Sequence, residues 1–180
     1  YREKDSHIHA REMADVVDIA RRMQAVCREY GVPFIMNDYV DVAVAIDADG
    51  VHVGQDDMSL ADVRDRVGQD KIIGVSCSTL DEALSAQANG ADYLGVASIF
   101  TTITKADATI IGVEGLQKIR SRVDIPIVAL GGVNFNNLLG VLDYSDSICM
   151  ISALYNGSGL SANVGRFSAV YSTRSGPQRS

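Results

Sequence analysis

The segment Gly50-Val51-His52-Val53-Gly54-Gln55-Asp56-Asp57 is a short apolar run followed at once by glycine, amide and carboxylate residues. Similar runs recur along the chain at intervals of about 20 to 25 residues. Runs without alternation are typical of strands that are buried on both faces, as in a parallel sheet. The six runs are Val32 to Met36, Gly50 to Val53, Ile72 to Val75, Tyr93 to Ala97, Ile125 to Leu130 and Ser147 to Ile151.

Helical patterns with suitable caps separate these runs. Residues Met13 to Tyr30 repeat apolar side chains at helical spacing and end before Gly31. Thr79 begins a capping box with Glu82, and the helix it predicts ends near Gly90. Ser59 to Val67 and Asn134 to Leu142 have the same character. The alternation predicts a βαβ series in one α/β domain.

A closed barrel and an open doubly wound sheet both satisfy this alternation. Polar and glycine residues follow nearly every strand, which favours a (β/α)8 TIM barrel, whose loops share one active-site face. A further strand that ends at Tyr1 gives seven, and we expect the first β/α unit to be missing from the sequence. Residues 1–171 are predicted to form the single barrel domain and 172–180 a flexible tail.

Composition excludes several functional classes. The 180 residues carry a net charge of −7 without a basic stripe, so we expect no nucleic-acid partner. Three widely spaced cysteines indicate reduced thiols, and no apolar stretch reaches 18 residues. These features predict a cytoplasmic protein that does not enter membranes. A homo-oligomer is compatible with the sequence, which does not specify the oligomeric state.

Two carboxylates follow neighbouring strands. Asn37-Asp38 ends the first apolar run, and Asp57 follows the second. Together Asp38 and Asp57 could bind Mg²⁺ beside a diphosphate, because this ion prefers a few carboxylates, phosphate oxygens and water. The alternative is that each aspartate only caps the helix that follows.

Other strand ends carry groups that suit anions. Arg2 and Lys4 share one face of a strand, although a solvated charged start is the alternative. Ser76 could donate to an anion or cap the next helix. The long segment from Ser98 to Ile111 contains Thr101-Thr102-Ile103-Thr104-Lys105, which suits a phosphate-binding lid. Gly131-Gly132 and Met150-Ile151-Ser152-Ala153 precede predicted helices and suit a phosphate site. We interpret His52 as a packed or supporting residue.

Taken in order, these motifs resemble the thiamine phosphate synthase family from Tyr1 to Tyr155. The most specific elements are Gly54-Gln55-Asp56-Asp57 and Thr102-Ile103-Thr104-Lys105. Two positions depart from the family pattern, which usually has proline at Thr101 and often histidine at Ser78. The supporting motifs are Arg2-Glu3-Lys4, Asn37-Asp38, Ile73-Gly74-Val75-Ser76, Gly90-Ala91-Asp92-Tyr93 and Ile127-Val128-Ala129-Leu130-Gly131-Gly132.

The resemblance implies roles for the pyrimidine side of the site. Arg2 and Lys4 would bind the diphosphate of the pyrimidine substrate, and Asn37 would contact the same group. Ser76 and Lys105 would bind the pyrimidine substrate. Arg2, Lys4, Lys105 and Ser76 would then be the catalytic residues.

The resemblance also implies a metal ion and a second substrate. Asp38 and Asp57 would hold Mg²⁺, and the second substrate would be a thiazole phosphate. The residues that would bind this thiazole phosphate are Thr102, Thr104, Gly132, Ile151 and Ser152.

The implied reaction joins the pyrimidine methyl diphosphate to the thiazole phosphate with loss of pyrophosphate. The protein would need no nucleophile, because its task is to stabilise charge on the leaving group and exclude water. One alternative is a related barrel that isomerises or only binds a thiazole phosphate or thiamine phosphate. Another is an unrelated phosphate-binding barrel.

Overall fold

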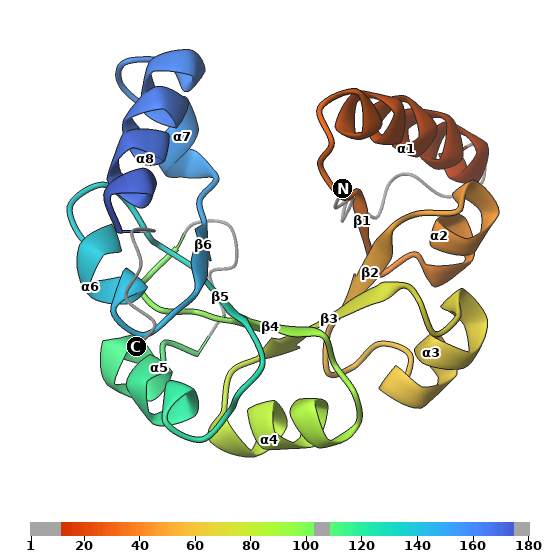
Figure 1. The fold of residues 1–180 in the computed structure, drawn as a ribbon, viewed down its shortest axis with the longest axis horizontal. Helices are drawn as coiled ribbons and strands as arrows, with labels where there is room; N and C mark the ends of the chain where they lie inside the picture. The colour runs from red at the N-terminus through yellow and green to blue at the C-terminus, as the bar shows by residue number, and fades with distance from the viewer. Residues whose placement is uncertain (1–11, 103–108, 175–180) are drawn as a thin grey trace.

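The computed structural model describes residues 12–102 and 109–174. Six parallel strands form one sheet in the order of the sequence, β1-β2-β3-β4-β5-β6. Figure 1 shows the sheet as a curved half-barrel with helices on its convex side. The strands are β1 (Ile35–Asn37), β2 (Gly50–Val53), β3 (Ile72–Cys77), β4 (Tyr93–Val96), β5 (Ile127–Leu130) and β6 (Ser147–Cys149).

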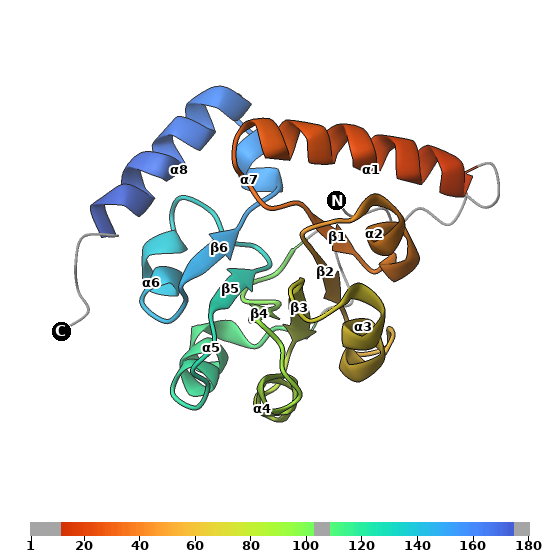
Figure 2. The same ribbon diagram turned by 45° about the vertical axis from the view of Figure 1, so that its right-hand side comes forward.

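Helices follow the strands around the outside of the arc. Figures 1 and 2 place the first and the last helix at the two ends of the arc, beside β1 and β6. The helices are α1 (Glu12–Glu29), α2 (Val40–Ile46), α3 (Leu60–Val67), α4 (Leu80–Ala88), α5 (Gly112–Arg120), α6 (Leu138–Leu142), α7 (Ser152–Tyr155) and α8 (Leu160–Arg174). No helix in the described ranges is both long and apolar enough to cross a bilayer.

The hydrophobic core lies between the sheet and the helices. Every second strand residue is buried there, including Met36, Val51 and Ile73, which are inaccessible to solvent. Their neighbours on the concave face, such as His52 and Ser76, are only half-buried. The prediction of strands buried on both faces is therefore wrong at His52, because the six described strands curve without enclosing their concave face.

The amino ends of the strands are tied together by a repeated aspartate contact. Asp49 accepts a hydrogen bond from the Phe34 N–H at 2.7 Å, and Asp92 accepts one from the Ile73 N–H at 2.7 Å. Asp146 accepts one from the Ile127 N–H at 2.8 Å. Each aspartate precedes its strand and satisfies a backbone donor at the start of the neighbouring strand, so this end of the sheet is occupied by structural contacts.

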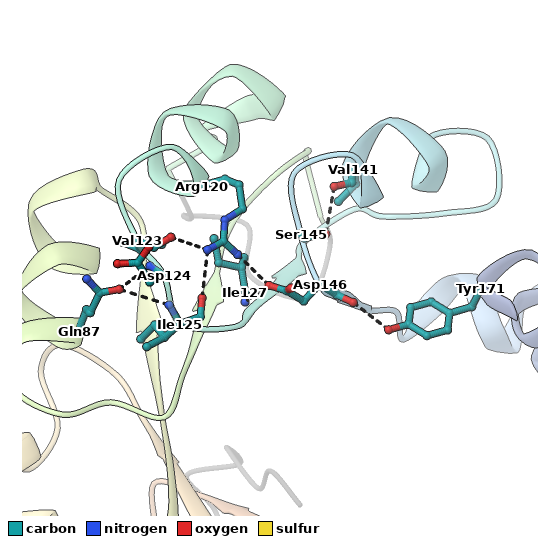
Figure 3. Close-up of polar contacts among 10 residues, drawn as sticks. All are labelled: Gln87, Arg120, Val123, Asp124, Ile125, Ile127, Val141, Ser145, Asp146 and Tyr171. Carbon is teal, nitrogen blue, oxygen red and sulfur yellow. Dashed lines mark hydrogen bonds and ion pairs between the residues drawn. The ribbon is translucent and has the colours of Figure 1, made fainter. Parts of the chain in front are cut away.

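Arg120 extends the contact at Asp146 to the surrounding helices (Figure 3). Its guanidinium lies 2.8 Å from the Asp146 carboxylate and also donates to the Val123 carbonyl. The Tyr171 hydroxyl donates to the Asp146 carbonyl at 2.8 Å. These bonds connect α5 and α8 to the starts of β5 and β6.

Several predicted element boundaries are confirmed. β2 has the expected bounds, Ser59 caps α3, and Thr79 and Glu82 form the capping box of α4. The helix expected from Asn134 begins later, at Leu138. The reason is that the Asn134 side chain donates to the Gly132 carbonyl and forms a turn instead.

The barrel prediction is met in part. The described residues form an α/β fold with a six-stranded parallel half-barrel. The strand expected to end at Tyr1 lies outside the described residues. Helix α8 continues to Arg174, so 172–174 of the expected tail are helical, and 175–180 lie outside the described residues.

Candidate active site at the carboxyl ends of the strands

The parallel strands bring their carboxyl ends to one edge of the sheet. The register pairs Asn37 with His52, and Leu130 with Cys149, so the segments that follow each strand begin side by side. The predicted site residues that this edge brings together are Asn37, Asp38, Asp57, Ser76, Thr102, Gly132, Ile151 and Ser152. Arg2, Lys4, Thr104 and Lys105 lie outside the described residues.

Asp38 and Asp57 line the same surface cavity, which has a volume of about 270 Å³. Met13 and Met58 also line it, so the carboxylates lie beside apolar groups. The backbone of Asp38 is left-handed, with φ of 65°, and its N–H donates to the His52 carbonyl at 2.9 Å. This hydrogen bond anchors Asp38 to the end of β2.

Neither aspartate caps a helix, so the capping alternative is wrong. The N-cap of α2 is Tyr39, which makes no side-chain cap hydrogen bond. Ser59 caps α3 by accepting from the Asp62 N–H. Asp57 instead accepts from the Gly54 N–H at 2.6 Å, which closes the turn after β2 and holds the carboxylate at the cavity.

His52, Ser76 and Tyr93 form a hydrogen-bonded group on the concave face. His52 Nδ1 lies 2.9 Å from the Tyr93 hydroxyl, and Nε2 lies 2.8 Å from Ser76 Oγ. The Gln55 side chain donates to the Ser76 carbonyl at 2.7 Å. Ser76 is thus held through both its side chain and its backbone, and it does not cap α4, whose cap is Thr79.

Two glycines provide the space for these rings. A Cβ atom at Gly95 would lie 2.8 Å from His52 Cε1, and a Cβ atom at Gly74 would overlap the Tyr93 ring. The side chains of these two positions would point at the concave face, where the imidazole and phenol lie. Glycine is therefore required at both positions by close approach.

The pKa values of the two rings shift in directions that keep both neutral. Burial lowers the pKa of His52, while the charges of Asp38 and Asp57 act in the opposite direction. Burial raises the pKa of Tyr93 to about 12, with a smaller contribution from Cys149. At neutral pH the imidazole is uncharged and the phenol keeps its proton.

The segment after β4 packs against the end of β5. The Ile99 N–H donates to the Leu130 carbonyl and the Phe100 N–H to the Gly131 carbonyl, both at 3.0 Å. A Cβ atom at Gly132 would lie 2.5 Å from the Thr101 carbonyl oxygen. The glycine pair therefore allows the segments after β4 and β5 to approach closely. Thr102 follows Thr101 in the chain, so it begins next to the glycine pair.

A helix follows Gly131-Gly132, as predicted, but α6 begins only at Leu138, so the glycine N–H groups do not lie at its amino end. The two glycines adopt positive φ angles of 93° and 65°. Neither N–H donates a hydrogen bond to another residue within the described ranges. Since Leu130 pairs with Cys149, Gly132 and Ile151 occupy equivalent positions beyond β5 and β6. Ser152 begins α7 there.

The donor set at this edge suits Mg²⁺ better than a metal held by protein alone. In the described ranges no three His, Cys, Asp or Glu side chains gather as a metal site. Mg²⁺ commonly takes one or two carboxylates and completes its shell with water and substrate phosphates. Asp38 and Asp57 fit that requirement.

A family model described as thiamine monophosphate synthase matches residues 1–154. The chain belongs to the thiamine monophosphate synthase family. The description names a transferase enzyme, and membership removes the alternative of an unrelated phosphate-binding barrel.

Curated relatives and a solved structure support this family assignment. The chain is 46% identical over 158 residues to "Thiamine-phosphate synthase" of Caldanaerobacter subterraneus, covering 87% of this chain and 72% of that protein. It is 50% identical over 141 residues to the Bacillus mycoides protein of that name, covering 77% and 64%. A solved thiamine phosphate pyrophosphorylase from Pyrococcus furiosus has a TM-score of 0.85 and 38% identity, covering 94% of this chain and 82% of that chain.

Sequence reasoning on the thiamine monophosphate synthase motifs missed two features of the site. Tyr93 was recognised only as part of a motif, and Gly95 was not singled out. A glycine within a buried strand signals close approach by another group, and Gly74 and Gly95 both carry that signal. The prediction that His52 is a supporting residue agrees with its hydrogen bonds to Tyr93 and Ser76.

Proposed function

We propose that this chain couples 4-amino-2-methyl-5-(diphosphooxymethyl)pyrimidine with 4-methyl-5-(2-phosphooxyethyl)thiazole to give thiamine phosphate and pyrophosphate. The observation that carries the proposal is the placement of Asp38 and Asp57 in one cavity, with neither side chain used as a helix cap. Ser76 lies on the neighbouring strand, held by His52 and Gln55. A diphosphate and a metal ion need such a combination of carboxylates and polar donors.

Mg²⁺ bound by Asp38 and Asp57 would supply positive charge to the departing pyrophosphate. Arg2, Lys4 and Lys105 would add cationic groups from outside the described residues, and Asn37 would donate to the diphosphate. Ser76 would contact the pyrimidine. The residues stabilise negative charge on the leaving group, and none is required to act as a nucleophile.

The thiazole phosphate would bind beyond β5 and β6. The N–H groups of Gly131 and Gly132 are available as donors there, and Ile151 and Ser152 begin the adjacent loop. Backbone donors of this kind bind phosphate well. Thr102 and Thr104 would complete this side of the site.

The bond changes follow from this arrangement. The C–O bond between the pyrimidine methylene and the diphosphate breaks, and the electron pair leaves with the pyrophosphate. The electron-rich aminopyrimidine stabilises the resulting cation, and the thiazole nitrogen then forms the new C–N bond. Exclusion of water matters because water would trap the cation.

The wider setting is also proposed. We infer a complete (β/α)8 barrel for the whole enzyme, because the six described strands have the parallel order of that fold. All three cysteines are free thiols, which supports a reducing cytoplasmic setting. A homo-oligomer is compatible with this arrangement.

The decisive experiment supplies both substrates and measures pyrophosphate release and thiamine phosphate formation across a Mg²⁺ titration. The proposal expects equal amounts of both products, and no release when Mg²⁺ is chelated. A related enzyme that isomerises the thiazole phosphate, or a protein that only binds it, would release no pyrophosphate. Binding of thiazole phosphate without pyrophosphate release would therefore refute the synthase assignment.

A further inference from the structure

We infer that His52 is a positioning residue that directs the hydroxyl proton of Ser76 toward the pyrimidine substrate, an inference that rests on the proposed function. His52 lies between Tyr93 and Ser76, within 2.9 Å and 2.8 Å of their oxygens. The three residues come from β2, β3 and β4, so the contact is a bridge across three strands. Ser76 makes no other side-chain hydrogen bond to a described residue.

The direction of the hydrogen bonds follows from their chemistry. A phenol hydroxyl is a better donor than acceptor, so Tyr93 donates to His52 Nδ1. The proton of the imidazole then sits on Nε2 and is donated to Ser76 Oγ. Ser76 accepts at its oxygen, and its own proton turns away from His52. On this concave face the proton is available to an acceptor atom of the substrate.

The geometry around the bridge permits little rearrangement. Gly95 leaves room for the imidazole, and Gly74 leaves room for the phenol ring. The two ring centroids lie 5.4 Å apart. The Gln55 side chain holds the Ser76 carbonyl at 2.7 Å, so the serine backbone is fixed as well. A held donor of this kind needs little reorganisation when substrate binds.

This arrangement has a consequence for specificity. Ser76 would present a hydrogen-bond donor to the pyrimidine substrate, while one of the two lone pairs of its oxygen accepts from His52. The directed proton favours a substrate acceptor, either a ring nitrogen or a diphosphate oxygen, at that point.

A double-mutant cycle tests the inference with His52→Leu, Ser76→Ala and the combined variant. His52→Leu should lower kcat/KM for the pyrimidine diphosphate about tenfold, the loss expected for one misdirected hydrogen bond, with little change in KM for the thiazole phosphate. In the Ser76→Ala background the same substitution should have almost no further effect. His52→Gln keeps an amide N–H donor and should recover most of the activity.

Tyr93→Phe gives a second cycle that preserves ring packing against Gly74. It should lower kcat/KM by a smaller factor, about threefold, because only the orientation of the imidazole proton is lost. This effect should also vanish in Ser76→Ala. If His52→Leu does not fold, the Tyr93→Phe cycle decides the question alone.

Additive losses in either cycle would overturn the inference, because they would show that His52 or Tyr93 acts independently of Ser76. Equal effects of His52→Leu on kcat/KM for both substrates would also overturn the inference. So would failure of His52→Gln to recover activity in a folded protein. These outcomes are separate from failure of the proposed function. If the proposed function fails, the unsubstituted protein itself does not form thiamine phosphate.

Discussion

Asp146→Ala should destabilise the fold more than an ordinary surface ion pair would suggest. The Asp146 carboxylate accepts hydrogen bonds from the Ile127 N–H and from Arg120, both at 2.8 Å (Figure 3). Ile127 is completely buried, so its N–H would be left without that partner. The contact also joins the starts of β5 and β6, whose carboxyl ends carry the proposed thiazole phosphate site.

The size of the effect can be worked out from these two bonds. An unsatisfied buried N–H costs about 1 to 3 kcal/mol. The ion pair contributes up to about 1 kcal/mol, because the side chains of Arg120 and Asp146 remain 27% and 37% exposed. The sum is a loss of about 1 to 4 kcal/mol in the free energy of unfolding. Asp146→Asn keeps an acceptor oxygen and should lose only about 1 kcal/mol.

Thermal and urea denaturation measure the loss, and Asp41→Ala is the matched control. Asp41 pairs with Arg66, the side chains are 85% and 50% exposed, and the carboxylate makes no contact with a strand amide that the structure describes. The control should lose about 0.5 kcal/mol. For a chain of this size Asp146→Ala should lower Tm by roughly 2 to 16 °C. Equal losses in Asp146→Ala and Asp41→Ala would show that the strand contact contributes nothing.

Other predictions concern the site, the packing and the pH response. Asp38→Ala should lower turnover about a hundredfold in the pyrophosphate assay, because stabilisation of the leaving group is lost; near-normal turnover would remove Asp38 from that role. Gly74→Ala should cost about 1 to 3 kcal/mol in denaturation, because the new methyl overlaps Tyr93. Gly140→Ala, with no atom within 4 Å, is its control and should not destabilise. Burial raises the pKa of Cys77 from 9.0 to about 12, so the folded state favours the protonated thiol. Its contribution to stability is present below pH 9 and is lost as the pH rises toward 12, and Cys77→Ala should flatten Tm against pH in that range.

The strand positions were predictable because their signal is local. The apolar composition of a run such as Gly50 to Val53 indicates a buried strand, and the end of the run marks where the functional loop begins. The sequence pattern does not define the bounds of helix α2, because Val40–Ile46 is rich in β-branched residues, and its packing against the sheet overrides that propensity. Helix α5 contains Gly115, where a Cβ atom would lie 2.9 Å from Ile111, so a residue unfavourable in helices is retained for packing.

The sequence by itself determined the alternation of strands and helices, the polar groups at the strand ends and the family resemblance, because each is written in short stretches of neighbouring residues. Only the tertiary structure decided that Asp38 and Asp57 share a cavity without capping a helix, and that His52 bridges Tyr93 and Ser76. These partners lie 24 and 41 positions from His52 in the chain. Their contact depends on the register of three parallel strands, and a slip of one residue would turn the imidazole to the opposite face of the sheet.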